Sequence, residues 1–204
     1  MSKHYTFALT LALSVVIASA AVAQAILVDR GDAALPTIGS TIADFKLSDA
    51  SGTEHSLSSL KGKNGTVLIF IATRCPVSNG YNERMEKLAQ DYKARGVNVV
   101  GINSNATESS DDIKAHAAEN KLTFTILKDK GNKIADRLGA ERTPEVYLLD
   151  ASNKLVYHGR IDNHKKPELV TANDLRDAIE AVLAGKPVAK TEAAAFGCSI
   201  KRAS

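Results

Sequence analysis

Cys75 is the residue of this sequence whose type and position best suit covalent chemistry. It comes three positions after an apolar stretch, residues 66–72, and directly before Pro76, which suits the first position of a helix because it needs no intrahelical N–H partner there. A thiol at a helix start faces unpaired backbone N–H groups and the positive end of the helix dipole, and both favour the thiolate. Arg74 adds a neighbouring cation. The pattern predicts a nucleophilic thiolate, and the alternative is an inert cysteine that packs as a small apolar side chain.

The elements that must position Cys75 alternate between strands and helices. Residues 66–72 are almost continuously apolar, as expected of a strand covered on both faces. Apolar residues at helical spacing follow Cys75, and the alternation predicts an α/β sheet whose functional crevice lies beyond the carboxyl ends of its strands. Further along, the pattern predicts strands 97–102 and 123–127, helices 110–120, 133–138 and 171–184, and a hairpin of strands 145–149 and 154–159 that makes the sheet mixed.

Both ends of the predicted domain carry recognisable signals. The last helix is expected to begin with a capping box formed by Thr171 and Asp174. Near the N-terminus, residues 44–47 and 53–57 flank a turn-rich segment and predict a hairpin that forms a surface ribbon. The expected organisation is a signal peptide at 1–25, an extended lead-in at 26–41, one domain at 42–186, and a tail at 187–204 that carries Cys198.

Two motifs resemble those of the thioredoxin superfamily. The stretch ATRCPVS resembles its active-site turn, with Cys75 in the place of the attacking cysteine and Ser78 where thioredoxins have the second one. The run Arg142-Thr143-Pro144 resembles that superfamily's loop with a cis-proline beside the active site. The resemblance implies a thioredoxin-like fold, with a central mixed β-sheet flanked by helices and an N-terminal β-hairpin extension. It also implies that Thr143, Pro144, Pro76 and Ser78 contact the substrate.

A third motif narrows the resemblance. The closing FGCSIK, residues 196–201, resembles the tail of the peroxiredoxin-like (redoxin) branch, of the alkyl hydroperoxide reductase/thiol-specific antioxidant type, and the likeness runs from about residue 42 to residue 201. True peroxiredoxins carry a proline and a threonine or serine where this chain has Leu68 and Ala72. Thr73 and Arg142 are then the candidates for the hydroxyl and the cation that would polarise an O–O bond, so peroxidase activity is a hypothesis.

Ser78 leaves Cys75 without a disulfide partner inside the turn. A sulfenic acid formed on Cys75 needs a resolving thiol, and Cys198 is the only other cysteine of the chain. We expect Cys198 to lie in a flexible tail that could carry it to Cys75. Three arrangements remain open: a redox pair, a permanent structural bridge, and no intrachain bridge.

The N-terminus and the composition restrict location and partners. Lys3 precedes an apolar run, residues 7–22, that ends in small residues, which predicts a cleaved export signal and a periplasmic or extracellular protein, with an uncleaved membrane anchor as the alternative. The formal net charge is only +3 and no polybasic run occurs, so nothing supports nucleic-acid binding or stable membrane association after cleavage.

The function that these residues favour is that of an enzyme. In this hypothesis Cys75 attacks a peroxide or a disulfide, and Cys198 or an external thiol reductant such as a thioredoxin-like protein regenerates it. The rival hypothesis is a redoxin-fold binding module without turnover. No cofactor and no metal are expected, because the histidines and aspartate within residues 157–164 are typical of a polar loop at a strand end.

Overall fold

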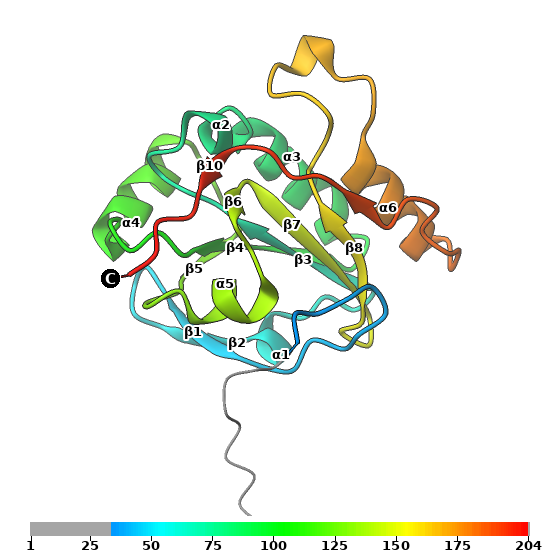
Figure 1. The fold of residues 1–204 in the computed structure, drawn as a ribbon, viewed down its shortest axis with the longest axis horizontal. Coiled ribbons are helices and arrows are strands. Elements are labelled where there is room, and N and C mark those ends of the chain that lie inside the picture. The colour runs from blue at the N-terminus through cyan, green and yellow to red at the C-terminus, as the bar shows by residue number, and fades with distance from the viewer. Residues whose placement is uncertain (1–33, 204) are drawn as a thin grey trace, which may run out of the picture. The chain divides into compact units, whose positions relative to one another are not determined.

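An eight-stranded mixed sheet forms the centre of the molecule, with strand order β2-β1-β5-β4-β3-β7-β8-β9 (Figure 1). The structure is a computed structural model that describes residues 34–203, so the expected signal peptide at 1–25 lies outside the described residues. The strands are β1 (Lys46–Asp49), β2 (Glu54–Ser56), β3 (Gly65–Phe70), β4 (Val97–Asn103), β5 (Thr125–Lys128), β6 (Arg142–Thr143), β7 (Glu145–Asp150), β8 (Leu155–Gly159), β9 (Glu192–Ala193) and β10 (Cys198–Ser199). The helices are α1 (Leu57–Leu60), α2 (Pro76–Asn79), α3 (Asn82–Lys93), α4 (Ser110–Glu119), α5 (Lys133–Leu138) and α6 (Asp174–Leu183), with a 3₁₀ turn at Pro167–Leu169.

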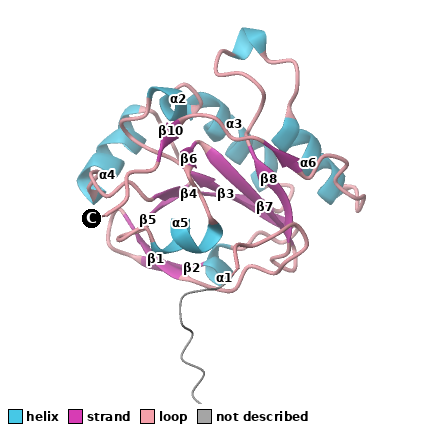
Figure 2. Ribbon diagram, viewed as in Figure 1, coloured by secondary structure: helices cyan, strands magenta, loops and turns pink. Residues whose placement is uncertain are grey.

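Strand β3 occupies the middle of the sheet and is buried along its whole length. It pairs with β4 in parallel and with β7 in antiparallel orientation, which confirms the predicted mixed sheet. Because successive side chains of a strand point to opposite faces, Val67 and Ile69 pack with α3, α4 and α6, whereas Leu68 and Phe70 pack with α1 and α5. Helices therefore cover both faces of the sheet (Figure 2), as the continuous apolar run predicts.

Two predicted helices differ from those observed. The helix after Cys75 is interrupted, so that a short α2 is followed by the amphipathic α3. The last helix begins at Asp174, after an Asn173 whose side chain makes no capping bond, so the predicted capping box with Thr171 is wrong. The reason is that both side chains have other partners: the Thr171 hydroxyl accepts from Asn163, and the Asp174 carboxylate pairs with Arg160.

The N-terminal hairpin is part of the central sheet and is not a surface ribbon, which corrects the sequence-based expectation. Strand β1 pairs with β5 as well as with β2, and Leu57, directly after the hairpin, is almost fully buried. The chain is already bound to the domain before residue 42, because the Gly39 N–H donates to the Leu155 carbonyl and Thr41 bridges to Lys154.

The C-terminal segment is docked along the domain, so the expectation of a flexible tail is wrong. Strand β9 pairs with β8, and β10 pairs with β6 in a separate two-stranded sheet. Figure 1 shows this segment, in red, crossing the sheet from α6 to α2. Within residues 34–203 no helix is both long and apolar enough to cross a bilayer.

Candidate active site

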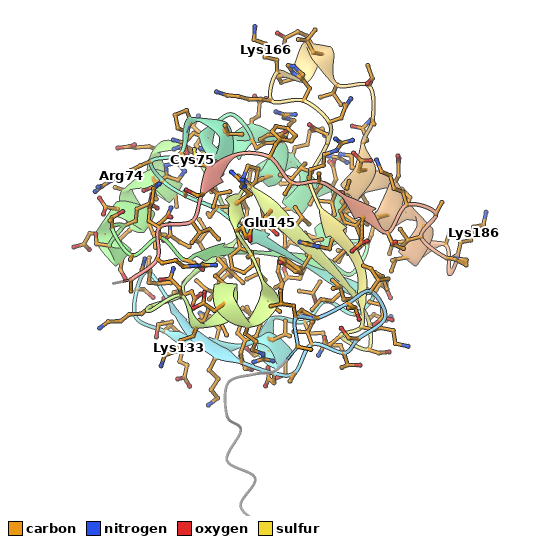
Figure 3. All side chains as sticks on the ribbon, viewed as in Figure 1. Arg74, Cys75, Lys133, Glu145, Lys166 and Lys186 are labelled. Atoms are coloured by element: carbon orange, nitrogen blue, oxygen red, sulfur yellow. The ribbon has the colours of Figure 1, made fainter. Side chains whose placement is uncertain are left out.

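Cys75 lies at the N-cap of α2, just beyond the carboxyl end of β3. Its Sγ accepts a hydrogen bond from the Ser78 N–H at 3.3 Å, as the sequence predicts for a thiol at a helix start. Cys75 is only 3% exposed, because β10 runs past it at the surface. Figure 3 shows Cys75 against this strand.

The loop before β7 forms the second wall of the site. The Thr143–Pro144 peptide bond is cis, as the thioredoxin-like motif predicts. The Thr143 carbonyl accepts a hydrogen bond from the Cys75 thiol at 3.4 Å, so the backbone preceding the proline is presented to the sulfur. Thr143 and Pro144 therefore lie where the resemblance places them.

Cys198 is brought to the site by main-chain pairing and not by chance proximity of a loose tail. In the β10–β6 ladder Cys198 lies directly opposite Thr143, and Ser199 lies opposite Arg142. Side chains of directly opposite residues share one face, so Cys198 faces the same side as Thr143. Both cysteines are free thiols in this structure.

The two thiols have opposite pKa shifts. Burial raises the pKa of Cys75, but hydrogen bonds from the Cys198 side chain and from the Ser78 N–H outweigh it, so that the pKa lies below its usual value. Burial also raises the pKa of Cys198, and the neighbouring Cys75 sulfur raises it further. The pair therefore favours a thiolate on Cys75 and a proton retained on Cys198.

Gly197 allows the tail to lie this close to the loop before β7. It has a φ of +151°, and a Cβ at this position would lie 2.0 Å from the Thr143 carbonyl oxygen. Only glycine adopts this conformation and fits this space without displacing the backbone. The FGCSIK motif thus has a structural basis: the residue before the cysteine must lack a side chain.

The remaining residues of the active-site turn are held by hydrogen bonds. The Ser78 hydroxyl accepts from the Ala72 N–H at 3.2 Å, so this side chain braces the turn in which it replaces a second cysteine. Pro76 occupies the first helical position and is exposed. The Thr73 hydroxyl is buried and has no partner among the described residues.

Neither arginine singled out in the sequence contacts the Cys75 sulfur. The Arg74 side chain is 63% exposed and pairs with Asp112 of α4, so its expected contribution to the thiolate is wrong; helix α4 holds the guanidinium away from the sulfur. Arg142 lies opposite Ser199, on the face of the two-stranded sheet that Cys198 does not use, and its guanidinium donates to the Gly197 carbonyl at 3.4 Å.

This placement gives a prediction for Arg142. An Arg142→Ala variant is expected to react with hydrogen peroxide at Cys75 within about threefold of the wild-type rate, because the guanidinium is not aimed at the sulfur. The rate is measured by following loss of the free thiol under excess peroxide. A decrease of about a hundredfold would instead make Arg142 part of the peroxide site, as the sequence analysis suggested.

Two buried carboxylates that the sequence analysis missed support the site. Glu145, directly after the cis-proline, accepts the N–H groups of Glu141 and Arg142 and pairs with His158. Glu108 accepts N–H groups from the turn before Cys75. An acidic residue at the start of an apolar strand was the available signal for Glu145, whereas nothing in the local sequence marked Glu108.

One histidine is buried away from the two cysteines' hydrogen bonds. His116 lies between α3 and α4 and bonds to Asn82. It is buried because its ring occupies the space beside the first turn of α3. Among the described residues, no group of three or more His, Cys, Asp or Glu side chains could hold a metal ion.

The fold and the site define a thioredoxin-like protein with a buried, activated thiol and a second thiol beside it. Its sequence matches the model of the AhpC/TSA family over residues 38–158, a range that includes Cys75 and Pro144 and ends before Cys198. The chain belongs to the AhpC/TSA family.

Individual relatives agree with this placement. A chloroplastic peroxiredoxin Q from Sedum lineare is 34% identical over 138 residues, which cover 63% of this chain and 73% of that protein. The thiol-disulfide oxidoreductase ResA of Halalkalibacterium halodurans is 31% identical over 125 residues, or 61% of this chain and 69% of that protein. The chain is accordingly a thiol-dependent oxidoreductase.

Solved structures extend the similarity over more of the chain. A hypothetical protein from Sinorhizobium meliloti 1021 superposes with a TM-score of 0.77 at 36% identity, over 82% of this chain and 96% of that one. A putative thiol:disulfide interchange protein DsbE from Chlorobium tepidum superposes with a TM-score of 0.61 at 25% identity, over 72% and 99%.

Proposed function

We propose that this protein is a two-cysteine thiol oxidoreductase in which Cys75 is oxidised first and Cys198 resolves it to an intrachain disulfide. The observation that carries the proposal is the register of β10 on β6, which holds Cys198 opposite Thr143 and so beside Cys75. Of the three arrangements that the sequence leaves open, the redox pair is the one that fits two free, adjacent thiols with opposite pKa shifts.

The chemistry balances with either oxidant. A peroxide gives its distal oxygen to the Cys75 thiolate, forming a sulfenic acid and releasing hydroxide or alkoxide; the Cys198 thiol then displaces the sulfenic oxygen as water. With a disulfide substrate, the Cys75 thiolate forms a mixed disulfide and expels one thiolate, and Cys198 then expels the second. Each route oxidises the two cysteines by two electrons and reduces the substrate by two.

The burial of Cys75 favours a small oxidant in the first step. Its sulfur lies beneath β10, and a peroxide can reach it with less movement of that strand than a protein disulfide needs. Peroxide is therefore the substrate that we propose first, with Thr73 as a candidate hydroxyl because that group is buried and otherwise unpaired among the described residues.

Reduction is proposed to proceed through Cys198. An external thiolate attacks the more accessible sulfur of the Cys75–Cys198 disulfide, and the cysteine with the lower pKa leaves more readily as a thiolate. Cys198 is partly exposed, and Cys75 has the lower pKa. A thioredoxin-like reductant would then form its mixed disulfide with Cys198.

We further propose that residues 1–25 direct export and that the protein acts in the periplasm or outside the cell.

Intact mass spectrometry of the reduced protein after brief exposure to hydrogen peroxide tests the proposal. The wild type is expected to lose two hydrogens, Cys75→Ser to remain unchanged, and Cys198→Ser to gain one or more oxygens. An inert wild-type protein, or a Cys198→Ser variant that still loses two hydrogens, would contradict it. The same experiment with oxidised glutathione compares the two classes of oxidant.

A further inference from the structure

A buried carboxylate lies next to the turn that carries Cys75. Glu108, in the loop between β4 and α4, is 3% exposed. Its carboxylate accepts the Thr73 N–H at 2.8 Å and the Arg74 N–H at 3.1 Å. The side-chain amides of Asn103 and Asn105 donate to the same carboxylate at 2.5 and 3.2 Å. Four donors thus satisfy a group whose burial would otherwise be unfavourable.

The same loop binds the segment that carries Cys198. The Asn105 side-chain oxygen accepts the Lys201 N–H at 2.7 Å. The Ala106 N–H donates to the Lys201 carbonyl at 2.8 Å. Lys201 is three residues after Cys198, so this loop binds both the N–H and the carbonyl of a residue just beyond β10. Asn105 therefore contacts Glu108 with one end of its amide and the tail with the other.

A cation completes the network. The Lys128 ammonium donates to the Asn103 side-chain oxygen at 3.0 Å and to the Asn105 carbonyl at 2.7 Å. Burial lowers the pKa of Lys128, and the negative charge of Glu108 acts in the opposite direction. Asn103 and Asn105 thus each bond to both Glu108 and Lys128, which fixes the shape of the loop. This loop contacts both the turn that carries Cys75 and the segment that carries Cys198.

We propose that Glu108 is a positioning residue for the redox pair, holding the Cys75 turn and, through Asn105, the Cys198 strand at a fixed separation. The inference rests on the proposed function, because it concerns the ease with which these two sulfurs join. Glutamine at position 108 would turn an NH₂ group toward the N–H donors of the turn, where the carboxylate now accepts them. The turn would then move while the tail stays on its other contacts.

The test compares Glu108→Gln with Glu86→Gln. Glu86 is a matched control, because it is a carboxylate 8% exposed that accepts a backbone N–H and a hydroxyl from Thr123, away from the cysteines. The measurement is the equilibrium between the Cys75–Cys198 disulfide and glutathione. Glu108→Gln is expected to shift this equilibrium constant about tenfold toward the reduced protein, relative to the wild type. Glu86→Gln is expected to change it by no more than about twofold. The two variants should lose comparable thermal stability. Equal glutathione equilibria for the two variants would overturn the inference.

A second variant keeps the test decisive if Glu108→Gln does not fold. Asn105→Ala removes the side-chain contact with the tail and leaves the two backbone bonds between Glu108 and the turn. It is expected to destabilise the disulfide and to move the pH profile of Cys75 alkylation to higher pH, because a displaced tail also weakens the interaction of Cys198 with the Cys75 sulfur. A general loss of stability would not move that profile. An unchanged disulfide equilibrium in Asn105→Ala would also overturn the inference. If the wild type forms no Cys75–Cys198 disulfide with either hydrogen peroxide or oxidised glutathione, the proposed function itself fails.

Discussion

A Gly197→Ala variant is expected to form the Cys75–Cys198 disulfide roughly a hundredfold more slowly than the wild type, because the new methyl group cannot coexist with the docked strand. The Cβ would lie 2.0 Å from the Thr143 carbonyl oxygen and 2.8 Å from its carbon. That carbonyl cannot easily move, since it belongs to the β6 backbone and accepts the Cys75 thiol. Strand β10 must therefore leave β6, and Cys198 becomes a thiol on a loose chain.

The rate is measured by adding oxidised glutathione to the reduced protein, quenching samples with an alkylating agent and weighing them. Gly185→Ala is the matched control, because Gly185 also has a positive φ, +65°, but no described atom lies within 4 Å of the position that its new methyl group would take. This control should lose about 1 kcal/mol of stability from backbone strain and close its disulfide at the wild-type rate. Wild-type closure in Gly197→Ala would mean that docking of β10 does not align the cysteines.

The central sheet and the position of Cys75 could be predicted because their signals are local. A continuous apolar run is enough to indicate a buried strand, and it corresponds to β3 at Gly65–Phe70. A cysteine followed by Pro76 at a strand end is enough to indicate the N-cap of a helix. Each of these features depends on residues adjacent in the sequence.

The docked tail could not be predicted for a physical reason. Strand β10 contains two residues and pairs with a segment more than fifty positions earlier, so it has no periodicity that a sequence could display. Its order comes from bonds to distant loops, such as the Ile200 N–H to the Glu141 carbonyl. The same holds for Glu108, whose role appears only when the loop after β4 meets the turn after β3.

The error at the last helix shows how tertiary partners displace a local preference. Thr171 and Asp174 have the spacing of a capping box, worth about 1 kcal/mol. Asp174 is instead buried between Arg160 and Lys190, two cations that bind its carboxylate at 2.7 and 2.6 Å. A buried carboxylate needs such partners more than a helix end needs one cap, so the helix starts later.

The interaction between the two neighbouring thiols gives the second large effect. Replacing Cys198 with alanine is expected to move the pH dependence of Cys75 alkylation to higher pH. Burial raises the pKa of Cys75, and among the interactions that lower it the hydrogen bond from the Cys198 side chain is the largest, ahead of the Ser78 N–H. Alanine removes that bond and keeps Gly197 and the β10 backbone in place, so the thiolate loses its main stabilisation.

The direction in which the pH profile moves follows from the species that reacts, which is the thiolate. Iodoacetamide reacts with the thiolate, so the rate at Cys75 rises with pH through the pKa of that thiol and then reaches a plateau. In the wild type the midpoint of this rise should lie below the pKa of an ordinary cysteine. In Cys198→Ala the midpoint should lie at a higher pH than in the wild type. The alkylation rate at neutral pH should therefore fall, while the plateau at high pH is retained. Peptide masses after timed alkylation at a series of pH values give the profile. Ser199→Ala, on the same strand but on its other face, should leave the profile unchanged. A midpoint in Cys198→Ala at or below that of the wild type would mean that Cys75 is ionised by the turn alone, with Cys198 taking no part before the chemical step.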